Sequence, residues 1–383
     1  MRVLVAPDKF RGTLSARQAT EAIATGWRRT RPDDRLDLAP MADGGEGTMA
    51  ALVDALHGEV VRAAVTGPRG DKVEAEFGIA EGANGRVAVV EMASASGLTL
   101  LSPSRRDPRL TTTRGTGELI LAALGHGPTR LIVGPGGSAT NDGGAGMAQA
   151  LGVRLLDEQG REIGAGGVAL AGLARIDATG VDHRLRGVTC VAATDVDNPL
   201  TGPSGATAVY APQKGASADD IVVLDRALGH LAAIVVRDLG VDHRDEPGAG
   251  SGGGLGFGLM AFLGARVRPG VDIVAEAMGL PSRMASADLA ITGEGRLDAQ
   301  SLRGKAPAGI MRLGRELSVP VAIVCGEAEE GLRLDDVAVV SLVERFGRED
   351  ALGDARRSLE RLAEELAGRA DELAAGRSGE GER

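Results

Sequence analysis

The chain has 383 residues, enough for two domains of ordinary size, and a net charge of −10 from 43 basic and 53 acidic residues. It has no basic stripe, which argues against a nucleic-acid partner, and no apolar run near the roughly 18 residues of a membrane-spanning helix. Aromatic residues make up only 2% and glycines number 58, so we expect a core of Val, Leu, Ile and Ala with many tight turns. The start, MRVLVAPDKF, is charged too soon for a signal peptide, so we expect a cytoplasmic protein.

Strand-like and helix-like runs alternate along the chain, which predicts an α/β fold with largely parallel sheets. Residues 60–65 and 73–79 flank the turn signal GPRGD and predict a hairpin instead. From Ala351 on, leucines at helical spacing predict one amphipathic helix. The other predicted strands are 2–6, 35–39, 86–91, 130–133, 153–156, 189–193, 206–210, 289–292, 319–324 and 337–342, and the other predicted helices are 16–28, 47–56, 115–124, 220–238 and 307–317.

The run GGSATNDGGAG, residues 136–146, follows a predicted strand and precedes a helix-like run. Strand, glycine turn and helix is an arrangement in which backbone N–H groups converge on an anion, because glycine lets the chain come close to a ligand. Ser138, Thr140 and Asn141 add neutral polar groups, and Asp142 adds a carboxylate suited to a hydroxyl or to magnesium. We interpret the run as an anion-binding loop; the alternative is a turn that only ends the strand.

Acidic residues recur in one context, in which an apolar strand ends and a carboxylate follows in a glycine-rich turn. In open α/β sheets, ligands bind beyond the carboxyl ends of the strands, so acids from several strands can meet in one cleft. A single such acid is commonly a helix cap or turn former, but the recurrence favours a site. The positions are Asp8, Asp43 with Glu46, Asp195 with Asp197, and Glu294 with Asp298.

Glycine-lined anion sites combined with several carboxylates suit phosphoryl transfer, in which magnesium screens the phosphates and a carboxylate accepts a proton. Asp195, with Asn198 beside it to orient it, is the predicted base, and Asp43 is next in line. Lys214 and Lys305 are predicted to neutralise charge on the transferred group. The sequence has no Walker motif, and none of its motifs contains a His that would activate a nucleophile or bind zinc.

Two other functions fit parts of the sequence. Gly134, Gly136 and Ala139 spell G-x-G-x-x-A after a strand, and Asp157 ends the next strand-like run, as in a Rossmann-type NAD-dependent oxidoreductase. A second glycine match at residues 248–253 follows a charged loop rather than a strand. A dinucleotide site does not explain the acid-bearing turns, and a non-catalytic nucleotide or metabolite sensor would not need them.

At these motifs the chain resembles the type 1 glycerate kinase family, from residue 1 to about residue 345. The similar segments, in the family's order, are APDKFRGTLSA, MADGGEGT, EMASASGL, TTTRGTGELI, GGSATNDGGAGMAQALG, DVDNPLTGPSGA, APQKGA, PGAGSGGG and ITGEGRLDAQSLRGKAP. The resemblance implies ATP- and Mg²⁺-dependent phosphorylation of D-glycerate, and it favours 2-phosphoglycerate over 3-phosphoglycerate as the product. A homodimer is compatible with the sequence.

The resemblance also implies a flavodoxin-like doubly wound domain with an inserted α/β domain that resembles a restriction-endonuclease core, and a site between them. We place the first domain at residues 1–65 plus 285–383 and the insert at 66–284, since the hairpin signal falls at the start of that insert.

The resemblance and the motifs together predict three sets of site residues. Asp195, Asp43 and Lys214 are the predicted catalytic residues, and Glu294, Asp298 and Asp197 are the predicted metal ligands. Asp197 stands where the family commonly has Thr, and Lys9, Phe10 and Arg11 stand where it usually has Ser, an aromatic residue and Lys. The predicted substrate- and phosphate-binding residues are Asp8, Lys9, Arg11, Glu46, Arg114, Gly136, Gly137, Ser138, Asn141, Asp142, Asn198, Gly293, Gly295 and Lys305.

Overall fold

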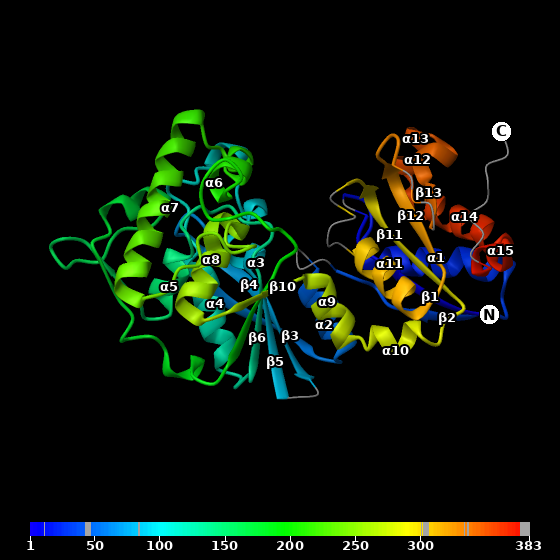
Figure 1. Ribbon diagram of the computed structural model, residues 1–383, viewed down its shortest axis with the longest axis horizontal. Coiled ribbons are helices and arrows are strands. Elements are labelled where there is room, and N and C mark those ends of the chain that lie inside the picture. Colours follow the sequence, from blue (N-terminus) through cyan, green and yellow to red (C-terminus); the bar gives the residue numbers. More distant parts are fainter. Residues whose placement is uncertain are drawn as a thin grey trace. The chain divides into compact units, whose positions relative to one another are not determined.

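Alternating strands and helices build two large sheets, one in each of two units of the chain (Figure 1). Unit 1 comprises Met1–Asp43 with Gly270–Arg383, and unit 2 comprises Gly44–Pro269. The computed structural model describes residues 1–10, 12–42, 47–82, 85–299, 301, 306–332, 334 and 337–375. The predicted α/β class is confirmed, with a parallel sheet in unit 1 and a mixed sheet in unit 2.

The described residues of unit 1 form a five-stranded parallel sheet in the order β13-β12-β11-β1-β2. Numbered within the unit, this order is 2-1-3-4-5, which is the strand order of flavodoxin-like sheets. The order reverses between β1 and β11, and doubly wound sheets bind ligands at such a switch point. The strands are β1 (Arg2–Pro7), β2 (Arg35–Leu38), β11 (Leu289–Leu297), β12 (Val321–Ala328) and β13 (Ala338–Ser341).

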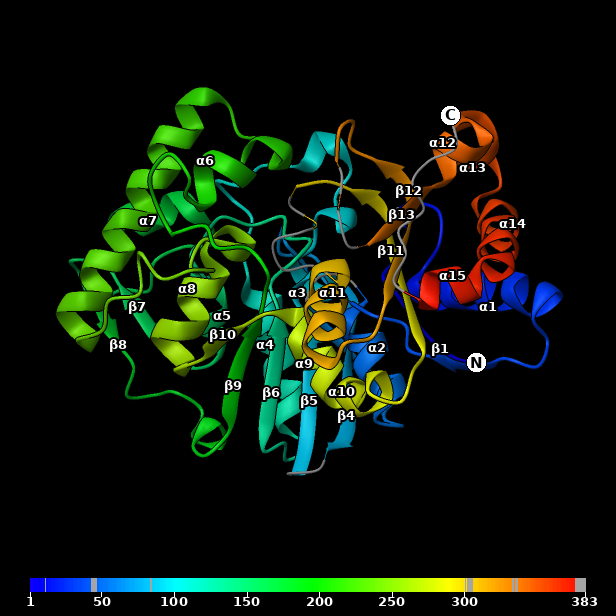
Figure 2. The same ribbon diagram turned by 45° about the vertical axis from the view of Figure 1, so that its right-hand side comes forward.

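Helices cover both faces of the unit 1 sheet. Figure 2 shows α1 (Ala16–Thr30) and α14 (Ala355–Gly368) on one side of β11 and β12, and α11 (Ala306–Leu317) on the other. Ser15 begins α1 with a capping box, because its side chain accepts from the N–H of Gln18 while the Gln18 side chain accepts from the N–H of Ser15. The single Trp of the chain, Trp27, is fully buried between α1, α14 and the sheet.

The predicted single helix from Ala351 is wrong, because the structure divides this region into α13 (Arg348–Gly353), α14 and α15 (Ala370–Ala374). Asp354 interrupts the first run and caps α14, since its carboxylate accepts a hydrogen bond from the N–H of Arg357. The apolar spacing nevertheless identified the buried face correctly: Leu359, Leu362, Leu366 and Leu373 all lie in the unit 1 core. Unit 1 also contains α9 (Gly270–Ala277), α10 (Leu280–Met284) and α12 (Leu342–Phe346).

The described residues of unit 2 form a six-stranded mixed sheet in the order β10-β9-β6-β5-β4-β3. The predicted hairpin is confirmed, since β3 (Glu59–Thr66) and β4 (Lys72–Gly82) pair antiparallel. β5 (Gly85–Glu91), β6 (Arg130–Gly134), β9 (Thr189–Ala193) and β10 (Arg266–Arg268) run parallel, so their carboxyl ends share one edge of the sheet.

The helices of unit 2 pack on both faces of this sheet, with α2 against β4 and β5 and with α4 and α8 against the core of the other face. Residues 206–210, predicted as a strand, form a helix, which corrects that prediction; a five-residue run is too short for periodicity to decide between the two states. The elements are α2 (Thr48–Ala55), α3 (Met92–Ser96), α4 (Arg114–Leu124), α5 (Ala145–Ala150), α6 (Ala206–Tyr210), α7 (Ala218–Leu239), α8 (Ser251–Leu263) and a separate antiparallel pair, β7 (Arg154–Leu156) and β8 (Arg175–Asp177).

The limits of the two units, at residues 43/44 and 269/270, differ from the predicted domain limits at 65/66 and 284/285. Residue 65 lies inside β3, whose whole length pairs with β4 in the unit 2 sheet. Residue 285 directly follows α10, which belongs to unit 1 together with α9. The hairpin signal therefore lies within unit 2, and the structural division falls before it.

Gly26 should be required for the packing of α1 on α14. A Cβ at Gly26 would lie 2.0 Å from the carbonyl oxygen of Glu360, so we expect Gly26→Ala to lower the free energy of unfolding by about 1–3 kcal/mol. Gly229→Ala is the control, because Gly229 lies inside α7 and the nearest atom to its added Cβ would be 3.9 Å away. The control should gain about 0.5–1 kcal/mol from helix propensity. Urea unfolding followed by circular dichroism measures both, and a Gly26→Ala protein as stable as wild type would contradict the close contact.

Candidate functional site

The loop between β6 and α5 occupies the carboxyl edge of the unit 2 sheet, as its sequence predicted. Gly137 is exposed there, while Ser138, Thr140, Asn141 and Asp142 are buried. Neighbouring segments fix its first part: Leu98 N donates to Gly137 O (2.9 Å), and Ala139 N donates to Ser96 O (2.9 Å). The loop thus presents a glycine backbone to solvent and turns most of its polar side chains inward.

Asp142 holds the second part of the loop onto the start of α4. Its Oδ2 accepts from Thr113 N (2.8 Å), Thr113 Oγ1 (3.0 Å) and Gly146 N (3.3 Å), and its Oδ1 accepts from Gly144 N (3.3 Å). Burial raises the pKa of this carboxyl, and these hydrogen bonds act in the opposite direction. The carboxylate therefore organises the turn into α5.

Lys214 approaches the same loop from the buried side. It ends a short 3-10 helix, Pro212–Lys214, and only 1% of the residue is exposed. Its Nζ donates to the carbonyl oxygen of Thr140 at 2.7 Å. Burial lowers the pKa of Lys214 to about 7, although the charge of Asp142 acts to raise it. A buried ammonium is thus bonded to the loop backbone near a buried carboxylate.

Thr140 and Asn141 retain unused hydrogen-bonding capacity. Asn141 Nδ2 donates to Thr207 Oγ1 of α6 at 2.9 Å. Asn141 Oδ1 and Thr140 Oγ1 are buried and have no hydrogen-bond partner among the described residues. Leaving a buried polar group unpaired costs about 1–3 kcal/mol, and such groups are expected beside binding sites rather than in an ordinary core.

A glycine triplet that is in none of the predicted sets of site residues packs against this segment. Gly252, Gly253 and Gly254, at the start of α8, have φ values of +63°, +70° and +87°. A Cβ on Gly253 would lie only 1.9 Å from Thr140 O, and Gly143 N donates to Gly253 O at 3.1 Å. The run GSGGG was the available signal, because three consecutive glycines at a helix start are unfavourable unless the backbone needs them.

The predicted base, Asp195, lies just beyond the end of β9 at the same edge of the sheet, and it is half-buried. Asp197 is exposed two residues further on. The amide of Asn198 holds the turn, because its Nδ2 donates to Ser204 O (2.7 Å) and its Oδ1 accepts from Tyr210 Oη (2.6 Å). β6 and β9 are neighbouring parallel strands, so the turn with Asp195 and the glycine-rich loop follow adjacent strand ends.

In unit 1, the predicted residues gather at the switch point between β1 and β11. Asp8 is buried directly after β1, and its N–H donates to Gly293 O at 2.8 Å. Lys9 N donates to Asp8 Oδ1 at 2.6 Å, and the Lys9 side chain is half-exposed. Asp8, Lys9 and Gly293 therefore lie together at the place where this sheet type binds ligands.

The prediction that Glu294 follows the end of a strand is wrong. Parallel pairing continues past it, from Glu294↔Cys325 to Leu297↔Ala328, so Gly293, Glu294 and Gly295 all lie inside β11. Only 7% of Glu294 is exposed. Asp298 does follow the strand, and its Oδ1 accepts from Ser301 N at 3.0 Å and from Ser301 Oγ at 3.1 Å.

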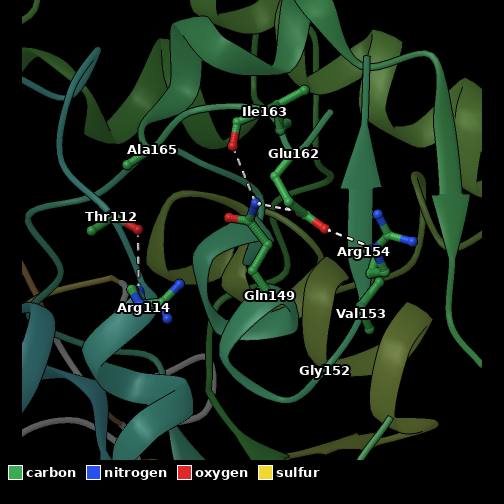
Figure 3. A pocket seen from close by; sticks show the side chains of 9 residues that line it. All are labelled: Thr112, Arg114, Gln149, Gly152, Val153, Arg154, Glu162, Ile163 and Ala165. Carbon is green, nitrogen blue, oxygen red and sulfur yellow. Dashed lines mark hydrogen bonds and ion pairs between the residues drawn. The ribbon is translucent and has the colours of Figure 1, made fainter. Parts of the chain in front are cut away.

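Arg114 begins α4 and lines a pocket of about 310 Å³, which is at the small end of ligand sites (Figure 3). Its Nε is paired with Glu118 Oε1 at 3.0 Å. Gln149 points across the pocket and donates to Glu162 Oε2 and Ile163 O (Figure 3). No residue of the glycine-rich loop lines this pocket, whose walls are Thr112, Arg114, Gln149, Gly152, Val153, Arg154, Glu162, Ile163 and Ala165.

Four predicted site residues, Arg11, Asp43, Glu46 and Lys305, lie outside the described residues.

Within the described ranges, no three His, Cys, Asp or Glu side chains are grouped as in an all-protein metal centre. In the same part of the chain, no helix combines the length and apolar character needed to cross a membrane.

The dinucleotide alternative lacks its expected geometry. In a Rossmann unit the strand after the glycine turn joins the parallel sheet, whereas β7 pairs antiparallel with β8 in a separate sheet. Asp157 closes a local turn, since its Oδ1 accepts from Gln159 N and Arg161 N and its Oδ2 pairs with Arg161. Asp157 is therefore a turn-forming acid and not a ribose ligand.

The buried ammonium of Lys214 should make stability depend on pH. Its folded pKa of about 7 lies below the reference value of 10.5, so the unfolded chain binds more protons between these two values and stability rises with pH across that window. The unfolding free energy of wild type minus that of Lys214→Met should therefore grow from pH 7 to pH 10, by about 1.4 kcal/mol for each unit of pKa difference. Lys72→Met, which removes an exposed ammonium, is the control. A constant difference would show that Lys214 is not desolvated.

Comparison with known proteins assigns the family. The model of the glycerate kinase family matches residues 3–371. A glycerate kinase of Bacillus subtilis (strain 168) is 53% identical over 326 residues, which is 85% of each chain. A glycerate 2-kinase of Escherichia coli (strain K12) is 48% identical over 340 residues, covering 89% of this chain and 87% of that protein.

A solved structure agrees over nearly the whole length. The crystal structure of a protein from Salmonella typhimurium LT2, described as a glycerate kinase 2, superposes with a TM-score of 0.85 at 44% identity and covers 97% of this chain and 98% of that one. These matches confirm the resemblance found in the sequence motifs. The chain belongs to the glycerate kinase family.

Proposed function

We propose that this protein phosphorylates D-glycerate with ATP and Mg²⁺, and that the product is 2-phosphoglycerate. The observation that carries the proposal is the identity of 47–53% to several proteins named glycerate kinase or glycerate 2-kinase, over at least 85% of this chain. The relative named glycerate 2-kinase supports the choice of the 2-hydroxyl. The geometry is compatible, because each unit carries polar side chains at the carboxyl ends of parallel strands.

In unit 2, we assign binding and proton transfer to neighbouring strand ends. The backbone around Gly136 and Gly137, with Ser138 and Asn141, binds an anionic group, either the glycerate carboxylate or a nucleotide phosphate. Asp195 accepts the proton of the attacking glycerate hydroxyl. The oxygen of that hydroxyl forms the new bond to the γ-phosphorus, while the bond from the γ-phosphorus to the β–γ bridging oxygen breaks and ADP is released. The Lys214 ammonium donates a hydrogen bond to the Thr140 carbonyl from the buried side of the loop.

In unit 1, we assign nucleotide and metal binding to the switch point. Asp8, Lys9 and the glycines of β11 lie where flavodoxin-like sheets bind ligands. Magnesium on a nucleotide usually takes one or two protein carboxylates, with phosphates and waters as its other ligands, so Glu294 and Asp298 fit without a larger cluster. When bound, Mg²⁺ would be held by Glu294 and Asp298 and would neutralise the charge of the phosphates.

Several further assignments stay predictions. Asp43 is proposed as an alternative base, Arg11, Glu46 and Lys305 as ligands of phosphate or substrate, and Asp197 as a further metal ligand. Arg114 is a predicted substrate residue whose charge is at present satisfied by Glu118. We also propose a cytoplasmic location and a homodimer.

The activity is tested by incubating the protein with ATP, Mg²⁺ and D-glycerate and identifying the phosphorylated carbon by phosphorus NMR. We expect 2-phosphoglycerate, and Asp195→Asn should lower kcat by roughly 10²–10⁴-fold with the fold intact, because positioned proton transfer contributes about that factor. Asp157→Ala is the matched control and should keep the wild-type rate, since Asp157 serves a local turn. Wild-type kcat in Asp195→Asn would remove this residue from the mechanism.

Glu294→Gln should raise the Mg²⁺ concentration needed for half-maximal rate by roughly 10-fold, because losing one carboxylate ligand weakens metal binding. Glu316→Gln, on an exposed part of α11, is the control and should leave the magnesium titration unchanged. A titration of Glu294→Gln that overlays wild type would exclude the metal role.

A further inference from the structure

Lysine is rare in this chain, and this makes the buried lysine informative. Only four of the 43 basic residues are lysines, namely Lys9, Lys72, Lys214 and Lys305. Arginine supplies the remaining positive charge, including the ion pairs on the surface. An ammonium is a compact charge with three donors, whereas a guanidinium is a broad planar fork. At Lys214 the surroundings therefore call for a small cation and not merely for a basic residue.

The Lys214 ammonium is bonded to the backbone of the loop and not to a side chain. Its donor–acceptor distance to Thr140 O is 2.7 Å, which is short for an N–H···O bond and typical of a charge-assisted one. Asp142, two residues later, is the buried acid whose charge favours the protonated lysine. Taking an ammonium out of water is costly unless it is paired and hydrogen-bonded. The Thr140 carbonyl supplies one hydrogen bond and the charge of Asp142 offsets part of that cost, although desolvation has the larger effect on the pKa of Lys214.

The same segment is fixed from other directions. Thr207 of α6 accepts from Asn141 Nδ2, and Gly253 of α8 packs on Thr140 O so closely that no side chain fits there. Asp142 is held at the start of α4 by both donors of Thr113. Thr140 O is thus the point where the Lys214 ammonium and Gly253 of α8 meet the loop.

From this geometry we propose that Lys214 is a positioning residue, whose ammonium holds the backbone of Thr140–Asp142 and so fixes the conformation in which Gly136, Gly137 and Ser138 bind their anion. The proposal rests on the anion-binding role proposed for the loop. It specifies how the positive charge acts: through the Thr140 carbonyl, and not by touching the transferred phosphoryl group. The ligand class served by the loop is a small carboxylate or phosphate anion.

The kinetic test compares Lys214→Met, Lys214→Arg and the exposed control Lys72→Met. We expect Lys214→Met to lose about 10²-fold or more in kcat/KM, because displacing a site by about 1 Å can cost that factor. Lys214→Arg should not restore the rate, since its larger head would displace the loop, and Lys72→Met should match wild type. Rescue by Arg would overturn the proposal in favour of a role for charge alone, and wild-type kinetics in Lys214→Met would exclude Lys214 altogether.

Hydrogen–deuterium exchange separates positioning from direct contact. Exchange in the peptide that covers residues 137–146 should rise in Lys214→Met while the rest of unit 2 stays protected. Loss of activity without faster exchange in that peptide would overturn the proposal and indicate that Lys214 contacts substrate.

The exchange measurement does not depend on turnover of any substrate. Wild type that does not phosphorylate D-glycerate would refute the proposed function instead, and it would leave these exchange measurements valid.

Discussion

The fold of unit 2 depends on burying the polar segment Thr140–Asp142 under the carboxyl ends of its parallel strands. A buried carboxylate or amide is costly unless hydrogen bonds within the protein replace those to water. Thr113 before α4 donates to the carboxylate of Asp142, and Thr207 in α6 accepts from the amide of Asn141. Lys214 donates to the backbone carbonyl of Thr140, on which Gly253 of α8 also packs. Four separate stretches of chain thus contact this one segment.

Glycine makes this arrangement possible where the backbones of two segments lie too close together for a side chain. At Gly253, at Gly26 and at Gly115, an added Cβ would lie about 2 Å or less from a carbonyl oxygen of another segment. Backbone-to-backbone packing of this kind lets polar main-chain groups, rather than bulky side chains, form the walls of the loop region. It also fits the low aromatic content of 2%, because closely packed backbones leave little room for large rings.

The sequence predicted most elements correctly where local pattern decides the outcome. The strand at residues 130–133 is a short apolar run followed by glycine, and the helices from Ala16 and near Asp220 begin at serine caps. Local pattern failed for residues 206–210, and it failed at Gly353–Asp354, where a cap interrupts an otherwise continuous apolar stripe.

The glycine-rich loop and the acid-bearing turns could be predicted because each is contiguous in the sequence. The contacts that hold the loop could not be, since Lys214 lies 74 positions from Thr140 and Thr207 lies 66 positions from Asn141. The position of Glu294 inside β11 was missed for a similar reason. Glycines on both sides of it suggest a turn, whereas pairing with the distant β12 keeps the segment extended.

The strand order of unit 1 has a consequence for how the chain is made. β1 lies in the middle of that sheet, and its neighbour β11 begins at Leu289, so the two are synthesised far apart in time. Unit 2 is one continuous stretch and can fold as soon as it leaves the ribosome, while the first strand and helix α1 wait for most of the protein to be translated. During that interval one edge of β1 and the apolar face around Trp27 lack their native cover. A nascent chain stalled before β11 would expose both, and it is at that stage that a chaperone would have most to bind.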